Sequence, residues 1–188
     1  GTTDITRTII IGKATKEHKD RFTRVLKGHI AIATNYFRID SQGSQLDPLA
    51  RKSLQEINCD YDHGTGHGIG SFLSVHEGPQ RIAKSQGLSD GLIKEGMILS
   101  NEPGFYKEGE YGIRTENLII VIKQSDLNLQ FETISWAPID IDLININILD
   151  YDEIIWLNNY HRKVYEKLKD KLDVREKKWL QKVTQPIS

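Results

Sequence analysis

The feature that most constrains the fold is the segment DHGTGHGIGSFLSVHEGPQ at residues 62–80, which is rich in glycine and histidine. Glycine alternates with other residues from Gly64 to Gly70, a density that disfavours a helix and lets other groups approach the backbone closely. One histidine alone would usually be a hydrogen-bonded core or surface residue. The segment carries three of them, at His63, His67 and His76. This combination indicates backbone shaped around a ligand.

The residues before this segment favour one strand followed by two helices. Residues 2–11 are rich in β-branched side chains, which predicts a strand. Apolar side chains recur at helical spacing over 16–37 and predict an amphipathic helix. After a loop at 41–45, Pro48 suits the first turn of a second helix that runs to about residue 57.

The residues after the segment favour strands and then helices. Two apolar runs, 94–106 and 111–123, are joined by a polar stretch and predict paired antiparallel strands, and 129–136 predicts another strand. Asp150 or Asp152 can cap a long helix, and 174–183 forms a final basic helix. This order predicts an α+β fold, with helices covering a largely antiparallel sheet.

Charge and size exclude several classes of function. A chain of 188 residues with net charge −1 has no long-range field that would attract nucleic acid or an anionic membrane, so neither is expected as a partner. No apolar run approaches the roughly 18 residues of a membrane span. The single cysteine, Cys59, has no internal partner for a disulfide, which favours a cytoplasmic location, although a start at Gly1 leaves a removed leader open.

Four oxygen or nitrogen donors stand at predicted strands or their edges: Asp4, His67, Glu102 and Glu116. Several carboxylates with one histidine and no thiolate suit two divalent ions such as Mn, Co or Zn. Two adjacent ions can clamp both groups of a hydrolysis.

Each of the three acids can be weighed as a metal ligand against an ordinary structural role. Asp4 alone would be a turn or strand-edge acid. Glu102 ends an apolar strand directly before Pro103, which aims its side chain. Glu116 lies on an apolar strand face and requires a cation to neutralise it, either a metal or Arg114 in a surface pair.

Three separated segments carry a resemblance to a known family. TTDITRT (2–8), HGTGHGIGSFLSVHEGP (63–79) and SNEPGFYKEGEYGIRTEN (100–117) resemble the signature segments of the pita-bread metallopeptidases, which include methionine aminopeptidase, prolidase and aminopeptidase P. The tail segments 156–168 and 179–188 resemble the C-terminal extension of the cytosolic, eukaryotic type of aminopeptidase P. The resemblance implies a curved, largely antiparallel sheet covered by helices. It also implies that residues 1–150 form the catalytic domain without its N-terminal part and that 151–188 form a helical extension packed on it.

The same resemblance implies roles for individual residues. The metal ligands would be Asp4, His67, Glu102 and Glu116, with a further aspartate expected before residue 1. Glu102 would also carry protons, while Arg114 would orient the metal-binding carboxylates.

Two histidines receive roles on the substrate side. His76 would contact the scissile peptide and stabilise the tetrahedral intermediate, and His63 would line the substrate pocket. A hydroxide bridging two ions, for which manganese is expected and cobalt or zinc are alternatives, would attack the first peptide bond of a substrate with proline second.

Three other functions compete with an Xaa-Pro aminopeptidase. Prolidase and methionine aminopeptidase would keep the metal chemistry and change the substrate, but the tail and the HGTGHGIG form argue against both. A pita-bread domain that binds a protein or peptide without catalysis would lose metal ligands by substitution, whereas the four expected positions are filled here.

The tail also predicts association. It carries Trp156, Tyr160, Trp179 and Leu180 on amphipathic segments, which is more aromatic surface than a short terminal helix requires for itself. We expect a homodimer, and the alternative is that the tail packs on its own domain.

Overall fold

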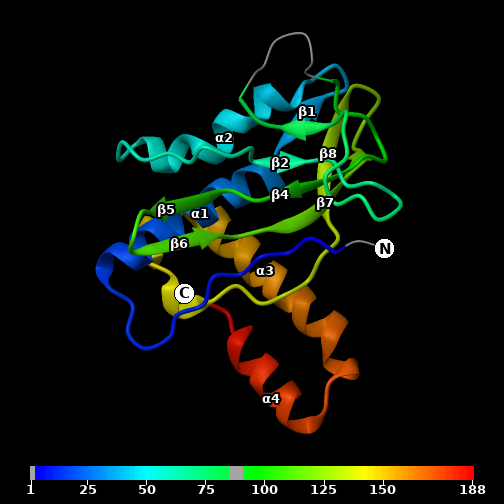
Figure 1. Ribbon diagram of the computed structural model, residues 1–188. Coiled ribbons are helices and arrows are strands. Elements are labelled where there is room, and N and C mark those ends of the chain that lie inside the picture. Colours follow the sequence, from blue (N-terminus) through cyan, green and yellow to red (C-terminus); the bar gives the residue numbers. More distant parts are fainter. Residues whose placement is uncertain (1–2, 85–90) are drawn as a thin grey trace.

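The computed structural model describes residues 3–84 and 91–188, and Figure 1 gives the course of the chain. Its helices are α1 (Lys16–Ala33), α2 (Gly43–Gln55), α3 (Tyr151–Leu168) and α4 (Val174–Val183), with short 3-10 turns at Ile141–Leu143, Ile146–Ile148 and Lys169–Lys171. Its strands are β1 (Tyr36–Arg38), β2 (Gly66–His67), β3 (Arg81–Ile82), β4 (Ile98–Asn101), β5 (Gly104–Lys107), β6 (Tyr111–Arg114), β7 (Asn117–Lys123) and β8 (Asn128–Thr133).

The strands form one four-stranded antiparallel sheet and two antiparallel pairs. The order in the larger sheet is β1-β8-β7-β4, while β2 pairs with β3 and β5 pairs with β6. A single bridge between Gly68, directly after β2, and Leu99 of β4 connects the two sheets, so the β2–β3 pair continues the surface of the four-stranded sheet. The predicted α+β architecture with a largely antiparallel sheet is confirmed.

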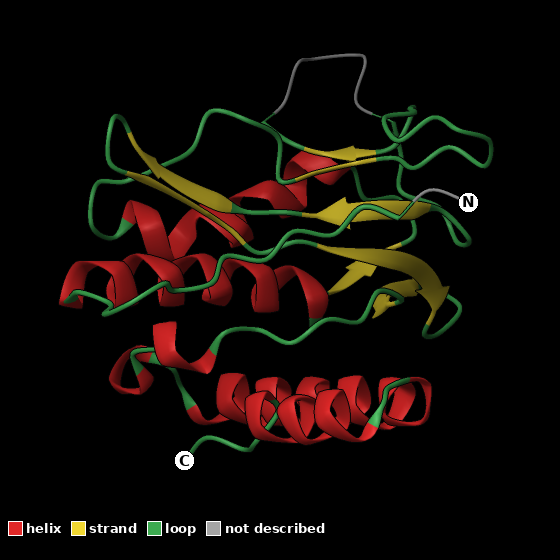
Figure 2. Cartoon of the chain, turned by 60° about the horizontal axis from the view of Figure 1, so that its bottom comes forward, coloured by secondary structure: helices red, strands yellow, loops and turns green. Residues whose placement is uncertain are grey.

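Helices cover one side of the strands, as Figure 2 shows. α1 and α2 pack on each other, and α1 also contacts α3. Phe22, Leu26, Leu157 and Val164 are almost fully excluded from solvent and belong to one apolar cluster, which joins α1 to α3. Burial of these side chains accounts for the close packing of α3 on α1.

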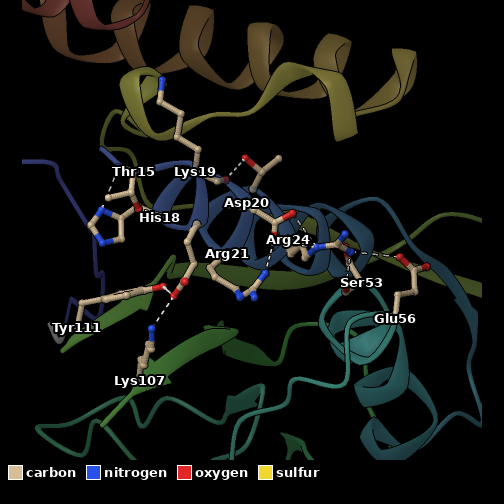
Figure 3. A network of polar contacts seen from close by, with 12 residues as sticks. Thr15, His18, Lys19, Asp20, Arg21, Arg24, Ser53, Glu56, Lys107 and Tyr111 are labelled. Carbon is tan, nitrogen blue, oxygen red and sulfur yellow. Dashed lines mark hydrogen bonds and ion pairs between the residues drawn. The ribbon is translucent and has the colours of Figure 1, made fainter. Parts of the chain in front are cut away.

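Polar contacts attach the start of α1 to the β5–β6 hairpin. Glu17 accepts hydrogen bonds from the hydroxyl of Tyr111 at 2.7 Å and from Nζ of Lys107 at 3.1 Å. Figure 3 shows Tyr111 and Lys107 reaching toward the helix, beside the cap formed by Thr15 and His18. The hairpin is therefore fixed at its tip as well as by its own ladder.

The predicted strand over 2–11 is wrong in extent. Residue 2 lies outside the described part of the chain, and residues 3–11 form a single bridge, between Thr6 and Glu116. Side chains hold this segment instead of a ladder: Arg7 donates to the carbonyl of Glu116, and Thr8 Oγ1 to that of Arg114.

The two predicted N-terminal helices have different boundaries. The first ends at Ala33 rather than 37, because both the N–H and the hydroxyl of Thr34 bond the carbonyl of Ile30. Phe37 belongs to β1, where it packs on Phe131. The second helix spans Gly43–Gln55, so the predicted loop at 41–45 is largely helical and Pro48 lies inside the helix.

A contact across the first turn accounts for the earlier start of this second helix. The side-chain oxygen of Gln45 accepts a hydrogen bond from the backbone N–H of Gln42 at 2.7 Å, which caps the first turn.

Each of the two long apolar runs breaks into two short strands. The run 94–106 divides into β4 and β5 around Glu102 and Pro103, and the run 111–123 divides into β6 and β7 around Glu116. β4 pairs with β7 and β5 pairs with β6, so the predicted antiparallel pairing is confirmed. Both acids therefore sit at breaks in the ladder, where side chains can turn toward a common point.

The C-terminal helices agree with the sequence prediction. Asp150 caps α3 through the backbone N–H of Glu153, and α4 spans the predicted residues. None of the helices described here combines the length and the apolar character that crossing a membrane requires.

Candidate metal centre

Three donors from distant parts of the sequence meet at one point. Asp4, His67 and Glu116 each offer one ligand atom, and the three atoms lie within 4.8 Å of one another. Asp4 comes from the extended N-terminal segment, His67 from β2, and Glu116 from the residue before β7. The Thr6–Glu116 bridge brings the first and last of these segments together. Two carboxylates and an imidazole form a donor set that suits a divalent cation.

Glu102 is attached to this group through His67. The Nε2 atom of His67 lies 3.1 Å from Oε1 of Glu102 and 3.2 Å from Oδ2 of Asp4. Its Nδ1 lies 3.1 Å from the carbonyl of Gly68 and donates to it. This bond leaves Nε2, the nitrogen that faces both carboxylates, as the one suited to bind a metal.

The ionisation of His67 and Glu102 reflects their contact. Burial lowers the pKa of His67, but the hydrogen bond to Glu102 and the charges of Glu102 and Asp4 outweigh it, so the pKa is raised. Burial raises the pKa of Glu102, but hydrogen bonds from His67 and from Ser100, at 3.0 Å, lower it overall. Glu102 therefore stays ionised.

Glu116 has the opposite shift. It is 2% exposed, and burial raises its pKa; the hydroxyl of Thr6 donates to it, but the charges of Glu102 and Asp4 raise the pKa further. Carboxylates that are crowded in this way repel one another unless a cation lies among them. The observed donor set thus fits a divalent metal, both in its chemistry and in its excess of negative charge.

Arg114 contacts Glu102 rather than Glu116. Its Nη1 lies 3.5 Å from Oε2 of Glu102, and its Nε donates to the hydroxyl of Tyr106 at 2.9 Å. The surface pair with Glu116 that the sequence left open does not form among the described contacts. Arg114 instead contacts the carboxylate of Glu102, which is itself one of the proposed ligands.

The other two histidines of the glycine-rich segment lie at different distances from the cluster. The ring of His76 is 4.2 Å from that of His67, centroid to centroid. His63 lies outside the cluster, with Nε2 2.9 Å from the hydroxyl of Tyr106 and Nδ1 2.8 Å from the carbonyl of Gly64. Burial, aided by the charge of Arg114, lowers the pKa of His63, so this ring is neutral and orients the tyrosine.

The glycine of β2 explains how the histidine strand approaches β4. A Cβ atom on Gly66 would lie 2.1 Å from the carbonyl oxygen of Ser100, closer than any real contact. The hydroxyl of Ser100 then accepts from the backbone N–H of His67 at 2.9 Å. The absent side chain is therefore what permits His67 to stand beside Glu102.

Three contacting residues were not identified from sequence as parts of the site: Thr6, Ser100 and Tyr106. Thr6 shares a strand face with Asp4, and Tyr106 follows Glu102 by four residues, but neither spacing reveals a contact across the fold. Ser100 carries no sequence signal that distinguishes it from any other strand serine.

Comparison with known proteins identifies the family that this chain matches. The model of metallopeptidase family M24 matches residues 1–123, and that of the C-terminal region of the same peptidases matches 128–187. Aminopeptidase P1 of Arabidopsis thaliana is 42% identical over 195 residues, and the probable Xaa-Pro aminopeptidase P of Coprinopsis cinerea is 44% identical over 196 residues. Both alignments cover all of this chain but only 30% and 32% of the relatives.

Solved structures of similar fold include an aminopeptidase and a prolidase. The X-prolyl aminopeptidase of Caenorhabditis elegans, described as a cytosolic enzyme with a di-nuclear active site, superposes with a TM-score of 0.91 at 38% identity, over all of this chain and 31% of that one. The prolidase of Pyrococcus furiosus superposes with a TM-score of 0.60 at 27% identity, over 72% of this chain and 38% of that one. On its sequence match, its fold and its cluster of donors, the chain belongs to metallopeptidase family M24.

Proposed function

We propose that this chain is the greater part of the catalytic domain of an Xaa-Pro aminopeptidase. The observation that carries the proposal is the convergence of Asp4, His67 and Glu116, with Glu102 bonded to His67, in a chain that matches this family over 1–123. The chain spans about a third of the length of the curated relatives it matches, so the activity is proposed for a protein of their length.

The proposed substrate is a peptide with proline in second position, cleaved before the proline. The name of the Coprinopsis relative, a probable Xaa-Pro aminopeptidase P, supports this class, as does the higher TM-score with the C. elegans X-prolyl aminopeptidase than with the Pyrococcus prolidase. We also propose a cytosolic location, because the C. elegans protein is described as cytosolic.

Asp4, His67, Glu102 and Glu116 would hold two divalent ions, with manganese as the proposed metal and cobalt or zinc as alternatives. When bound, such ions act as Lewis acids that polarise the scissile carbonyl and lower the pKa of water. The di-nuclear site described for the C. elegans enzyme supports this number of ions.

The side chains of this chain would divide the remaining work. Glu102, which stays ionised, accepts a proton from the attacking water and delivers it to the leaving amine. His76, beside His67, donates to the oxygen of the tetrahedral intermediate. Arg114 keeps Glu102 oriented, and His63 contributes to the substrate pocket through Tyr106.

The chain is proposed to comprise two parts. Residues 1–150 would form the catalytic domain, and 151–188 a helical extension packed on it, as the contact of α3 with α1 supports. Four tail residues suggested a dimer surface from sequence, but Tyr160 and Leu180 are buried in this chain and Trp156 is partly buried.

Trp179, which is 56% exposed, supports a homodimer contact for the intact protein. It borders a cavity of about 490 Å³ that is also lined by Ile9 and Pro138. Light scattering of the intact protein with and without residues 173–188 tests this proposal. A halved mass on deletion is expected, and an unchanged mass would contradict it.

The function is tested with the intact protein and a matched pair of variants. We expect two manganese ions per chain and cleavage of an Xaa-Pro peptide. Glu116→Gln should lose more metal affinity than the about 10–100-fold that removing a ligand's hydrogen-bond partner costs, because a neutral amide replaces the ligand itself. Glu132→Gln makes the same change at an exposed position on β8 and should alter neither property. Equal metal binding by the two variants would refute the ligand assignment, and a wild-type protein without cleavage would refute the activity.

A further inference from the structure

A second polar network lies behind the donor cluster, inside the fold. Its centre is His29 on α1, which is 0% exposed. The ring nitrogen Nδ1 lies 3.1 Å from the carbonyl of Asn101, and Nε2 lies 3.2 Å from the side-chain amide of Asn117. Asn101 returns a hydrogen bond of 2.9 Å from its Nδ2 to the carbonyl of His29. One neutral histidine thus joins the ends of two strands, with Nδ1 as donor and Nε2 as acceptor.

These two asparagines stand next to the proposed ligands. Asn101 is the last residue of β4 and pairs in register with Asn117, the first residue of β7. Glu102 follows the one and Glu116 precedes the other. A shift of the end of β4 would therefore move Glu102, and a shift of the start of β7 would move Glu116, relative to the other proposed ligands.

Arg7 connects the third ligand-bearing segment to the same point. Its Nη1 donates to the carbonyls of Thr6 at 2.8 Å and Glu116 at 2.6 Å, and its Nη2 donates to Oδ1 of Asn117 at 2.7 Å. Arg7 lies three residues after Asp4. A single guanidinium therefore fixes the segment that carries Asp4 against the start of β7.

The partners of this cation are unusual for a guanidinium. Every hydrogen bond that Arg7 donates to the described residues ends on a carbonyl, amide or hydroxyl oxygen, and burial lowers the pKa of Arg7. Desolvating a cation without a paired carboxylate is costly, so its retention here favours a positional role over a simple ion pair.

The network closes on the C-terminal region. The hydroxyl of Tyr160 on α3 accepts from Nη2 of Arg7 at 2.7 Å and lies 3.2 Å from Oδ1 of Asn117. Nη2 of Arg7 also donates to the carbonyl of Ala137 at 2.9 Å. Both Ala137 and Tyr160 fall within residues 128–187, the part that matches the separate C-terminal family model.

We propose that His29, Asn117, Arg7 and Tyr160 are positioning residues for the metal centre, through which the C-terminal region sets the spacing of Asp4, Glu102 and Glu116. The inference rests on the proposed metal site. It makes the C-terminal region part of the metal scaffold, in addition to any role in association.

The test uses the intact protein and the pair Tyr160→Phe and Tyr165→Phe. Each variant loses one hydroxyl from α3, but only Tyr160 belongs to the network, whereas Tyr165 lies under the ammonium of Lys169. The ring of Tyr160 keeps its stacking on Trp136 and Trp156 after the change, which favours folding. The measurements are Mn²⁺ affinity and stoichiometry by calorimetry, the visible spectrum of the Co²⁺ form, and kcat and KM for an Xaa-Pro peptide.

Tyr160→Phe should weaken the binding of at least one ion by about 10-fold, alter the Co²⁺ spectrum and lower kcat more than KM changes. Tyr165→Phe should change none of these. An unchanged affinity and spectrum in folded Tyr160→Phe would overturn the proposal, even if its Tm falls, because the network would then serve packing alone. If the wild-type protein binds metal but does not cleave an Xaa-Pro peptide, the proposed activity is refuted. The metal affinity and Co²⁺ spectrum of Tyr160→Phe would still test the present inference.

Arg7→Lys provides an independent check. Lysine keeps the positive charge but cannot span the carbonyl of Glu116 and the amide of Asn117 together. A loss of metal affinity as in Tyr160→Phe is expected. Wild-type affinity and spectrum in Arg7→Lys would show that charge suffices and would contradict the positional role.

Discussion

At the scale of single residues, burial decides the state of histidines that look alike in the sequence. His29 and His161 both lie on helices, α1 and α3, outside the histidine-rich segment. Each is almost fully excluded from solvent, and burial together with the nearby charge of Arg7 lowers both pKa values, to about 3 and about 4. Both rings are therefore neutral acceptors in the folded chain.

His161 leads to a prediction about stability and pH. Its Nε2 accepts from the backbone N–H of Ile139 at 3.0 Å, so protonation would break this bond. The pKa is about 4 in the folded state and about 6.5 in an unfolded chain, so between these values the unfolded state binds the additional proton. The contribution of neutral His161 to the stability of the folded protein is therefore complete above about pH 6.5 and is lost as the pH falls toward 4.

The comparison is between wild type and His161→Gln, which can still accept from Ile139 but does not titrate. The free energy of unfolding, measured in urea at pH 7 and at pH 5, should fall by about 2 kcal/mol less in the variant than in wild type. Equal losses in the two proteins would show that His161 does not cause the acid sensitivity.

At the scale of elements, close approach of two helices overrides helix propensity. Gly28 lies inside α1, where glycine costs about 1 kcal/mol relative to alanine. A Cβ atom at this position would lie 2.1 Å from the carbonyl oxygen of Ala50 on α2. Contact between the two helices thus requires the residue that the isolated helix disfavours.

Gly28→Ala is therefore expected to destabilise the protein, by on the order of 1–3 kcal/mol, because α1 and α2 must move apart. Propensity alone predicts the opposite sign. Thermal unfolding of the variant distinguishes the two, and a raised Tm would contradict the packing argument.

At the scale of the whole molecule, the proposed activity depends on more than these 188 residues. The chain covers 31% of the C. elegans enzyme and about as much of its curated relatives. The family resemblance leads us to expect one further aspartate ligand in a protein of the relatives' length. Two dications held close together would need that negative charge as well as the four donors of this chain.

The 188-residue chain alone is therefore predicted to cleave an Xaa-Pro peptide at least about 100-fold more slowly than the intact protein. Its manganese stoichiometry should be below two. Side-by-side assays at equal protein and metal concentration provide the measurement, and comparable rates would show that the assignment of the missing ligand is wrong.

The sequence alone determined the features that depend on neighbouring residues. Asp150, one of the two predicted caps with Asp152, precedes a run of apolar positions at helical spacing and caps α3; such a cap could be predicted because it is a contact over three residues. The same holds for the spacing within the histidine segment and around Glu102, which carried the family resemblance. Local chemistry of this kind needs no knowledge of the fold.

Only the tertiary structure decided which groups meet. Within the described residues 3–11, the predicted strand pairs through Thr6 alone, and Glu116 bonds Thr6 rather than Arg114. His29 joins Asn101 and Asn117 across 72 and 88 residues. Such contacts follow from strand register and burial, which are set by packing of the whole chain rather than by any short pattern.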